Sequence, residues 1–380
     1  MMYVNYERSY DSFDGSEHVY RVYMDHLEGG DAFKPGDAQS YNMSGPTFKN
    51  EFPEVLDYVR FYRLEKTTLK LNEKVLEVGN SCIADPSYFD VFNAKLLKGD
   101  MNTALKDPNA IVLTETVAKH LFGNEDPIGK TIQVFWRSPI LTKVTGVMKD
   151  TPQNSHFKIS YLLSYSTMMG WDAIGKREKV LNWNQNMYYT YLKIAPNTDI
   201  DAFTKKVVES DFDGHVDERQ NIEPIESIHL HSNKPYESEA NGSIMRIKFL
   251  TAIAVIILVL SLLNYINLST TKSLERAKEV GVRKVVGAQK QHLIVQSLLE
   301  SIVLNVIALV IAIMITIVLL PVYNSFTGKA ISIELSSISG IIWILGSIFV
   351  GMVIAGLYPA IVLSKYAPSK ALKGRVRTSA

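Results

Sequence analysis

The stretch Ser269–Gln291, STTKSLERAKEVGVRKVVGAQKQ, lies between two long apolar runs and decides how the chain is organised. Two of its residues are acidic, Glu275 and Glu279. Six are basic: Lys272, Arg276, Lys278, Arg283, Lys284 and Lys290. Short loops rich in Lys and Arg beside membrane spans stay in the cytoplasm. The sequence therefore predicts a cytoplasmic segment here, and this prediction fixes the orientation of the rest of the chain.

The same stretch has the periodicity of a helix. Apolar and small residues recur at steps of three and four: Leu274, Ala277, Gly281, Val285 and Ala288. Glu279 precedes Arg283 by one turn, the favourable order for a charged pair on a helix. Gly281 and Gly287 each cost about 1 kcal/mol relative to Ala, and such residues often mark a bend or a close approach by another backbone. We predict a short, kinked cytoplasmic helix over 270–290, held either by another protein or by anionic lipid.

Three apolar blocks follow residue 248, and each is long enough to cross a bilayer. We predict spans near 249–268, 293–320 and 338–363. The connection between the second and third spans has only Lys329 and Glu334 as charged residues. The tail after the third is basic: Lys365, Lys370, Lys373, Arg375 and Arg377. The charges therefore place the basic segment inside the cell, the connection between the second and third spans outside, and the C-terminal tail inside. The basic residues on the inner side outnumber Arg246 and Lys248, which lie at the outer end of the first span and argue for the opposite orientation.

Four polar residues interrupt the first two predicted spans. Asn264 and Asn267 lie near the inner end of the first span, and Glu300 and Asn305 lie within the second. An acid in the membrane is costly unless it is paired or hydrated, so we weigh a transport role for Glu300 against helix-to-helix hydrogen bonding, which we favour for all four. Small residues recur every four positions in the third span: Ser347, Gly351 and Ala355. They predict close packing against another helix, in this chain or in a second copy.

Residues 1–240 have the mixed composition of a folded domain that is long enough for a sizeable core. Alternating residues predict strands over 19–25, 131–136, 143–150 and 187–194. Apolar faces predict helices over 115–122, capped by Thr114, and over 199–209. We therefore predict an α+β extracytoplasmic domain over 1–240 and an all-α transmembrane domain with three helices over 241–380. Residues 210–245 are polar and are predicted to form a hinged connection between them.

The composition excludes several classes of protein. The formal net charge is +1, which offers no basic field for nucleic acid. The one cysteine, Cys82, cannot form an intramolecular disulfide. The opening MMYVNYERSYDSFDG lacks the charged and apolar regions of a signal peptide. Because a large exported domain must be carried across the membrane, we expect a signal or a first span to precede it.

No stretch has the pattern of an enzyme active site. GNEDPIGKT, which includes Lys130, resembles a phosphate-binding loop, but it has one residue too many between its glycines. A helix is also predicted before it and a strand after it, the reverse of that motif, so we interpret it as a turn. His229 and His231 would point to the same side of an extended segment, but no third metal ligand lies at a diagnostic spacing. We therefore predict no catalytic residue and no metal site.

The run ERAKEVGVRKVVGAQKQHLIVQSLLES resembles the signature of the FtsX/MacB-like permease subunits of ABC transporters. In the first domain, YERSYDSFDGSEHVYRV, ADPSYFDVFNAKLLKGD and IVLTETVAKHLFGNEDPIGKTIQV resemble the MacB-like periplasmic core domain of that family. GLYPAIVLSKYAPSKALKG resembles a segment that stands midway in long Bacteroidetes-type members, before a second similar half. The resemblance covers essentially the whole chain, and the cytoplasmic run is its most specific part.

The resemblance implies a bacterial inner-membrane permease whose first span precedes a periplasmic domain. It implies that the cytoplasmic helix docks on a separate ATPase, so the chain itself needs no cofactor and ATP is bound by the partner. The coupling residues would be Glu279, Gly281, Arg283, Lys284, Gly287 and Ala288. Further partners would be the lipid bilayer, a second permease copy or half, and a periplasmic or outer-membrane protein.

Family members export antibiotics, peptides or toxins, extract lipoproteins, or relay ATPase motion to cell-wall hydrolases. The resemblance therefore implies export or mechanical transmission. The alternatives are a membrane-anchored binding or signalling protein, and a regulator of cell-wall hydrolases without transport.

Overall fold

The computed structural model describes residues 2–28, 32–169, 183, 186–210, 212, 214, 216–286, 290–332, 341, 342, 345, 346 and 349. For part of 269–301 it describes the backbone alone. The chain divides into two compact units. One unit is Asn5–Ile244, called the ectodomain below, and the other is Met1–Val4 together with Met245–Ala380, called the helical unit.

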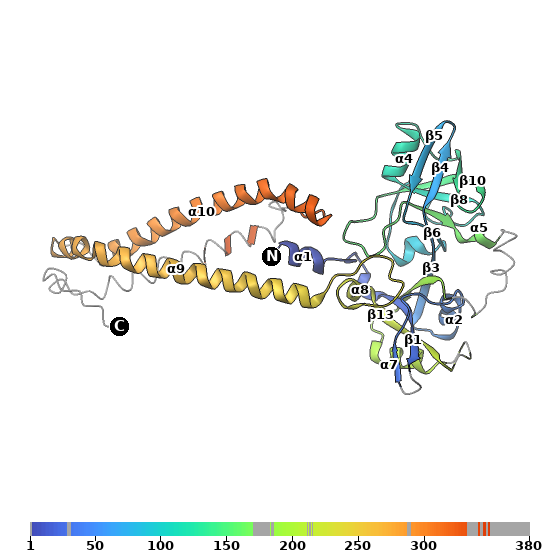
Figure 1. Cartoon of the computed structure of the whole chain (residues 1–380), viewed down its shortest axis with the longest axis horizontal. Helices are drawn as coiled ribbons and strands as arrows, with labels where there is room; N and C mark the ends of the chain where they lie inside the picture. Colours follow the sequence, from blue (N-terminus) through green and yellow to red (C-terminus); the bar gives the residue numbers. More distant parts are fainter. Residues whose placement is uncertain are drawn as a thin grey trace. The chain divides into compact units, whose positions relative to one another are not determined.

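The described ectodomain is built on one 13-stranded sheet. Its main path runs β13-β1-β12-β3-β6-β11-β8-β10-β9-β4-β5, while β2 pairs with β1 and β7 with β10. The strands are β1 (Val19–Glu28), β2 (Ala32–Pro35), β3 (Val55–Leu64), β4 (Thr67–Leu71), β5 (Lys74–Val78), β6 (Ser81–Ala84), β7 (Leu96–Gly99), β8 (Ala110–Thr114), β9 (Thr131–Phe135), β10 (Pro139–Met148), β11 (Tyr161–Ser164), β12 (Tyr188–Ile194) and β13 (Glu218–Pro224). Figure 1 shows β4 and β5 beside α4 at one end of the ectodomain, and β1 and β13 near α7 at the other.

The ectodomain also contains short helices, most of which pack on the sheet. They are α1 (Met2–Arg8), which begins in the helical unit, the 3-10 turn η1 (Ser16–His18), α2 (Ser44–Glu51), α3 (Tyr88–Val91), α4 (Glu115–Phe122), α5 (Tyr165–Met169), α7 (Ile200–Glu209) and α8 (Ile225–His231). Three apolar clusters result. Phe48 of α2 and Phe203 of α7 pack with Val22 of β1 in one of them, while Leu121 of α4 packs with Val134 of β9 in another.

Most predicted elements of the ectodomain are confirmed. Strands form at β1, β9, β10 and β12, and helices form at α4 and α7. Asp199 caps α7 by accepting a hydrogen bond from the Ala202 amide at 3.1 Å. The predicted cap of α4 is wrong in its chemistry, because the Thr114 side chain makes no capping hydrogen bond. Asp150 accepts from the Thr116 amide at 3.1 Å instead, so a distant carboxylate satisfies this helix end.

The predicted polar connection over 210–245 is wrong in its middle part. Residues Glu218–Pro224 form β13, which pairs antiparallel with β1, and Ile225–His231 form α8. Polar residues can form this strand because neighbouring elements supply charged partners for them, as shown below for Glu223. The ectodomain therefore continues up to the first long helix.

Two long helices form most of the described part of the helical unit: α9 (Ile244–Val285) and α10 (Lys290–Thr327). Each contains a candidate membrane span, Ile244–Leu268 in α9 and Ile302–Thr327 in α10, with mean hydropathies of 2.5 and 3.1. None of either apolar window is buried, whereas a core helix of a soluble protein would be covered. The first predicted span is therefore confirmed as a candidate, and the third, 338–363, lies almost wholly outside the described residues.

The second predicted span, 293–320, lies within α10 and overlaps the candidate span Ile302–Thr327. The helix continues past the predicted end of the span, through Pro321 to Thr327. Proline removes one backbone hydrogen bond without ending a helix in a membrane, so Pro321 does not terminate α10.

Candidate functional site

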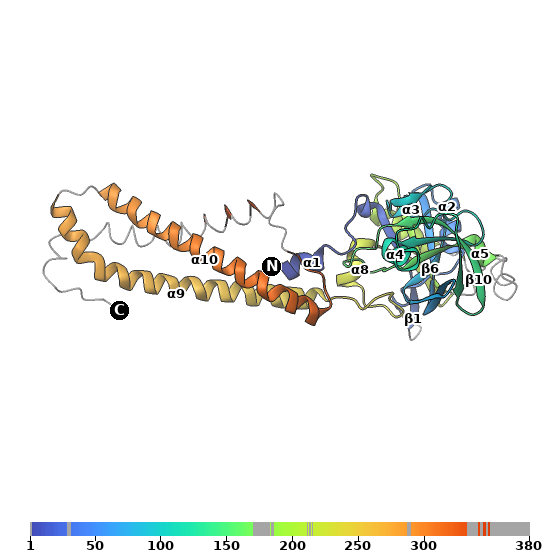
Figure 2. The same ribbon diagram turned by 90° about the horizontal axis from the view of Figure 1, so that it is seen from above.

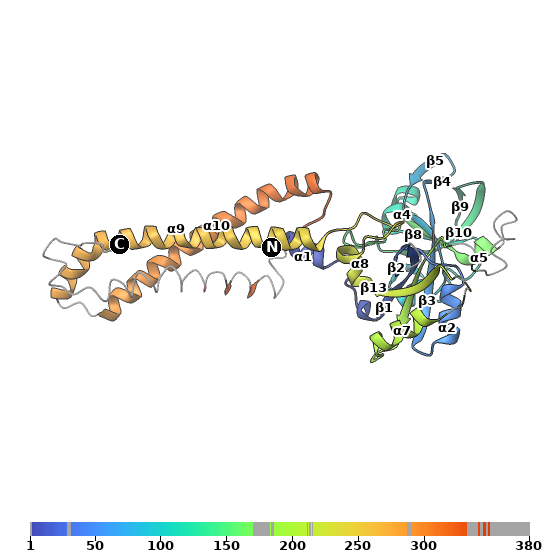
Figure 3. The same cartoon turned by 60° about the horizontal axis from the view of Figure 1, so that its bottom comes forward.

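The predicted coupling segment is the C-terminal part of α9. The prediction of a separate short helix is wrong, because one helix of 42 residues joins the first span to Val285. At 1.5 Å per residue such a helix is about 63 Å long. Figures 2 and 3 both show its ribbon changing direction towards its C-terminal end. The span and the basic segment are thus one continuous helix with a bend.

Four of the predicted coupling residues lie in the last two turns of α9: Glu279, Gly281, Arg283 and Lys284. Gly287 and Ala288 lie outside the described residues. Two apolar side chains of this segment are described. Val282 is 50% exposed and Val286, four residues later, is 82% exposed. Two exposed valines one turn apart, among basic residues, form a small apolar surface that a protein groove can cover.

The predicted intramembrane polar residues lie on the two long helices, α9 and α10. Asn264 and Asn267 lie in the last two turns of the first candidate span. Glu300 accepts a hydrogen bond from Gln296 Nε2 at 3.3 Å, and its position within the membrane stays a prediction. Asn305 lies within the second candidate span and is half-buried. Ser347, Gly351 and Ala355 lie outside the described residues, and the packing roles of all these residues remain predictions.

A buried charge cluster joins the end of the ectodomain to its sheet. Arg21 on β1 is fully buried and lies opposite Glu223 on β13. Its guanidinium donates to Glu223 at 2.6 Å and to Glu237 at 2.6 and 2.8 Å. Lys234 donates to the other oxygen of Glu223 at 2.7 Å. Burial alone would lower the pKa of Arg21, but the hydrogen bonds and charges of these two carboxylates outweigh it and raise that pKa.

Residues Ser232–Asn241, called the strap below, connect α8 to the last residues before α9. Backbone groups along the strap are tied to the ectodomain: the Ala38 amide donates to the Pro235 carbonyl at 3.0 Å, and Tyr189 Oη donates to the Tyr236 carbonyl at 2.7 Å. Arg63 also donates to the carbonyl of Ser238. Because groups from different strands hold the strap at several points, it is fixed to the sheet over most of its length.

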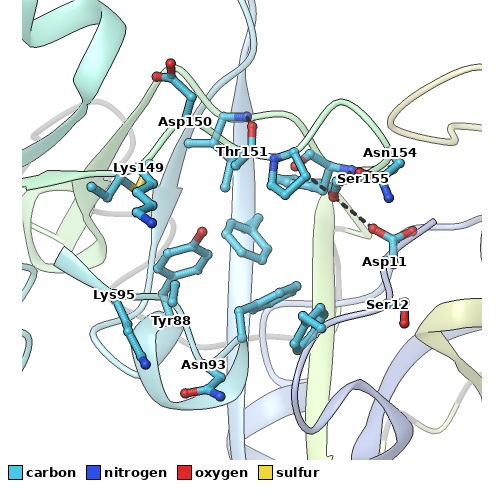
Figure 4. Close-up of a pocket in the computed structure, with 18 residues that line it drawn as sticks. Asp11, Ser12, Tyr88, Asn93, Lys95, Lys149, Asp150, Thr151, Asn154 and Ser155 are labelled. Atoms are coloured by element: carbon cyan, nitrogen blue, oxygen red, sulfur yellow. Dashed lines mark hydrogen bonds between the residues drawn. The ribbon is translucent and has the colours of Figure 1, made fainter. Parts of the chain in front are cut away.

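A cavity of about 380 Å³ lies in the ectodomain (Figure 4). Its residues come from β3, α3, the end of β10 and the loops 11–13, 93–95 and 149–155. Aromatic rings line much of it: Phe13, Phe61, Tyr88, Phe92 and Phe157. The size and apolar lining are those of a small-molecule site.

The two histidines considered as metal ligands lie in different environments, and only His229 is held within the fold. They lie in α8 and not in an extended segment, so their side chains diverge. His229 Nε2 lies 3.0 Å from Glu7 Oε2, and its ring stacks on Tyr10 at 3.4 Å between centroids. His231 is exposed. Among the residues that the structure describes, no group of three or more His, Cys, Asp or Glu side chains could hold a metal ion.

The loop that resembles a phosphate-binding motif is a turn between α4 and β9, as predicted. Gly123 ends α4 with a φ of 64°, a conformation that favours glycine. Lys130 forms an ion pair with Glu125 on the surface. The loop thus has the order helix, turn, strand and does not open a helix towards a phosphate.

A mixed α/β domain followed by two long, exposed apolar helices, the first of which ends in a basic segment, is typical of a membrane protein with a large domain outside the membrane. Residues 1–210 match the MacB-like periplasmic core domain, and residues 251–368 match the FtsX-like permease C-terminal domain. The chain belongs to the FtsX/MacB-like family of ABC transporter permeases.

Named relatives agree with this family. The chain is 27% identical over 251 residues to the macrolide export ATP-binding/permease protein MacB of Aggregatibacter actinomycetemcomitans, covering 60% of this chain and 34% of the relative. The MacB protein of Neisseria gonorrhoeae is 26% identical over 298 residues, covering 75% of this chain and 42% of that protein. The chain thus spans less than half the length of these curated relatives. The crystal structure of the periplasmic region of MacB from Actinobacillus actinomycetemcomitans aligns with a TM-score of 0.41 and 19% identity, over 56% of this chain and 91% of that one.

Proposed function

We propose that this chain is the permease subunit of an ABC transporter, and that it couples a separate cytoplasmic ATPase to its own ectodomain. The coupling would drive export of an antibiotic, peptide or lipoprotein, or mechanical transmission to an extracytoplasmic partner. The chain would act in the inner membrane beside a second permease copy or half, with the ectodomain in the periplasm. It would contain no catalytic residue, because ATP hydrolysis occurs on the partner.

The observation that carries this proposal is the continuity of α9. The same helix contains the first candidate span and most of the basic segment. A helix is stiff along its axis, so a displacement of its cytoplasmic end is transmitted through the membrane as a shift or tilt. A solvated loop between the span and the basic segment would absorb such a displacement.

The strap supports the same proposal from the other end of α9. It leads into α9 and is fixed to the sheet through Arg21, Tyr189 and Arg63. A pull on Ile244 would therefore act on β1, β12 and β3 rather than extend a slack linker. In this proposal the connection over 210–245 transmits force, in place of the hinge expected there.

Charge and exposed apolar surface support docking at the cytoplasmic end. The stretch Ser269–Gln291 has six basic and two acidic residues, which favours the cytoplasmic side. Val282 and Val286 add apolar surface that an ATPase groove can bury. Binding to anionic lipid requires only the basic residues and does not require the two exposed valines.

Two substitutions test coupling directly. Gly281→Trp places a bulky side chain where the docking helix approaches its partner, and Arg283→Glu reverses a charge in the same turn. We expect both variants to abolish stimulation of the co-purified ATPase in nanodiscs while leaving thermal unfolding of the ectodomain unchanged. Lys248→Glu, a charge reversal at the other end of α9, is the matched control and should couple normally. Normal stimulation by either test variant would show that this segment does not dock on the ATPase.

A further inference from the structure

The ectodomain cavity has a rigid apolar floor. The Phe61 ring lies 4.5 Å from Phe157 and 5.6 Å from Phe92, measured between centroids. Phe13 extends the cluster through Phe92 at 5.7 Å. Phe61 and Phe157 are at most 5% exposed and belong to one of the three apolar clusters, which holds their rings in place. The cavity is therefore pre-formed and need not reorganise to admit an apolar group.

Hydrogen bonds also fix the cavity walls. The Asp11 carboxylate accepts from Ser155 Oγ at 2.8 Å and from the His156 amide at 3.0 Å, which ties the first loop to the loop after β10. Asn154 Nδ2 donates to the Ser9 carbonyl at 2.8 Å in the same region. On the opposite wall the Asp150 carboxylate is engaged by Thr116 at the start of α4. Both aspartates are thus committed to protein donors.

The two lysines at the rim of the cavity differ from these aspartates. Lys95 and Lys149 are exposed, and within the described residues neither ammonium group has a hydrogen-bond or ion-pair partner. Figure 4 shows both lysines on one side of the aromatic rings, whereas Asp11 and Ser155 lie on the other side. The same view shows the Asp150 carboxylate directed away from the rings. The charge of the rim is therefore unevenly distributed, and its unpaired positive charge lies on the side of Lys95 and Lys149.

From this arrangement we infer that the ectodomain binds an anionic amphiphile, with its apolar chain on the Phe61–Phe92–Phe157 floor and its acidic head group between Lys95 and Lys149. The aromatic floor gains free energy from apolar area removed from water, and the lysines select the charge of the head group. The inference goes beyond the proposed function, because binding involves the ectodomain alone and requires no ATPase.

Calorimetry of the full chain in phosphatidylcholine nanodiscs tests this inference, with empty nanodiscs as the background. Decanoate is the anionic probe, and decanol is the neutral probe of the same chain length. Two exposed charge contacts should make decanoate bind about three- to tenfold more tightly than decanol. The double variant Lys95→Gln, Lys149→Gln should lose this preference and still bind decanol. The double variant Lys106→Gln, Lys143→Gln is the matched control, since it removes two exposed lysines outside the cavity lining and should keep the preference.

Methyl NMR locates the ligand in the same sample. Signals of Met148 and Ile159, which line the cavity, should shift on addition of decanoate. Equal affinity for decanoate and decanol would overturn the inference. So would an unchanged preference after the cavity lysines are replaced, or binding without shifts of these two methyl signals. Failure of the Gly281 and Arg283 variants to uncouple the ATPase would leave each of these results unaffected.

Discussion

Replacing Arg21 by methionine should destabilise the ectodomain strongly. The guanidinium is fully buried and bridges Glu223 of β13 to Glu237 of the strap. The side chains of these two glutamates are only 13% and 11% exposed. Without Arg21, two carboxylates would share one remaining cation, Lys234, in a site that water reaches poorly. The strap would then lose its ion pair with β1, and β13 would keep only its backbone pairing with that strand.

The expected cost follows from the charge that is left without a partner. Removing one member of a buried ion pair costs about 3–5 kcal/mol, a large part of the total stability of a domain. For a domain of this size each kcal/mol lowers Tm by about 2–4 °C. The Arg21→Met variant should therefore unfold about 6–20 °C below wild type. Replacing Glu223 and Glu237 by leucine as well should recover much of this loss, because no unpaired charge remains.

Thermal unfolding of the full chain in nanodiscs, followed by tryptophan fluorescence, measures the effect. Arg8→Met is the matched control, since Arg8 is exposed and a surface substitution changes stability by less than about 0.5 kcal/mol. A Tm of Arg21→Met that equals that of the control would refute the reasoning. It would mean that the cluster contributes nothing to holding the strap, and the mechanical part of the proposed function would lose its support.

Three further predictions concern single sites. Burial lowers the pKa of His229 to about 4 from a value of 6.5. Between these two pH values the unfolded chain therefore binds more protons than the folded chain, so the free energy of unfolding should fall as the pH drops from 6.5 to 4. The urea midpoint of the His229→Gln variant should fall less over the same pH range. A wild-type midpoint that does not change from pH 7 to pH 5 would contradict this. Asp150→Ala should lower the free energy of unfolding by about 0.5–2 kcal/mol, because it removes the carboxylate that caps the N-terminus of α4. Gln153→Ala, at an exposed residue, is the control and should have no measurable effect. Equal urea midpoints for the two variants would contradict the capping role. Burial raises the pKa of the Cys82 thiol to about 12, so this thiol should react with a maleimide only after unfolding in urea, and rapid labelling of the native chain would be the contrary result.

Local periodicity was sufficient to predict several elements of the ectodomain. In α4 the apolar residues Val117, Ala118, Leu121 and Phe122 lie on the buried face, and Gly123 ends the helix. Such faces are encoded by residues three and four apart, so the sequence alone reveals them. The same holds for β12, whose tyrosines and other residues favour a strand.

The strap and β13 could not be predicted in this way. In ERQNIEP the only apolar side chains are those of Ile222 and Pro224, and burial of the rest depends on partners from distant parts of the chain. Arg21 and Glu223 are 202 residues apart, and no local pattern marks such a pair. A lone arginine between apolar residues of a predicted strand was the available signal, since a buried charge requires a partner. The cavity was missed for the same reason, because its floor and rim come from several separate segments.

The membrane helices show the limits of charge and hydropathy counting. The basic segment, the first span and their order were predicted, but the continuity of α9 was not. Gly281 was expected to interrupt a helix, but α9 continues through it to Val285, although a glycine inside a helix costs about 1 kcal/mol relative to Ala. The second apolar helix also continues through Pro321 to Thr327, beyond the predicted end of the span at residue 320.

Sidedness is tested most directly by labelling single introduced thiols in spheroplasts with a membrane-impermeant maleimide. The native Cys82 is buried and gives a low background. Lys106→Cys places a thiol on the exposed surface of the ectodomain, and Val286→Cys places one at the end of α9, where Val286 is 82% exposed. We predict that the Lys106→Cys variant is labelled in intact spheroplasts and that the Val286→Cys variant is labelled only after permeabilisation. Labelling in the reverse order would contradict the account, since a basic segment outside the cell cannot dock on a cytoplasmic ATPase.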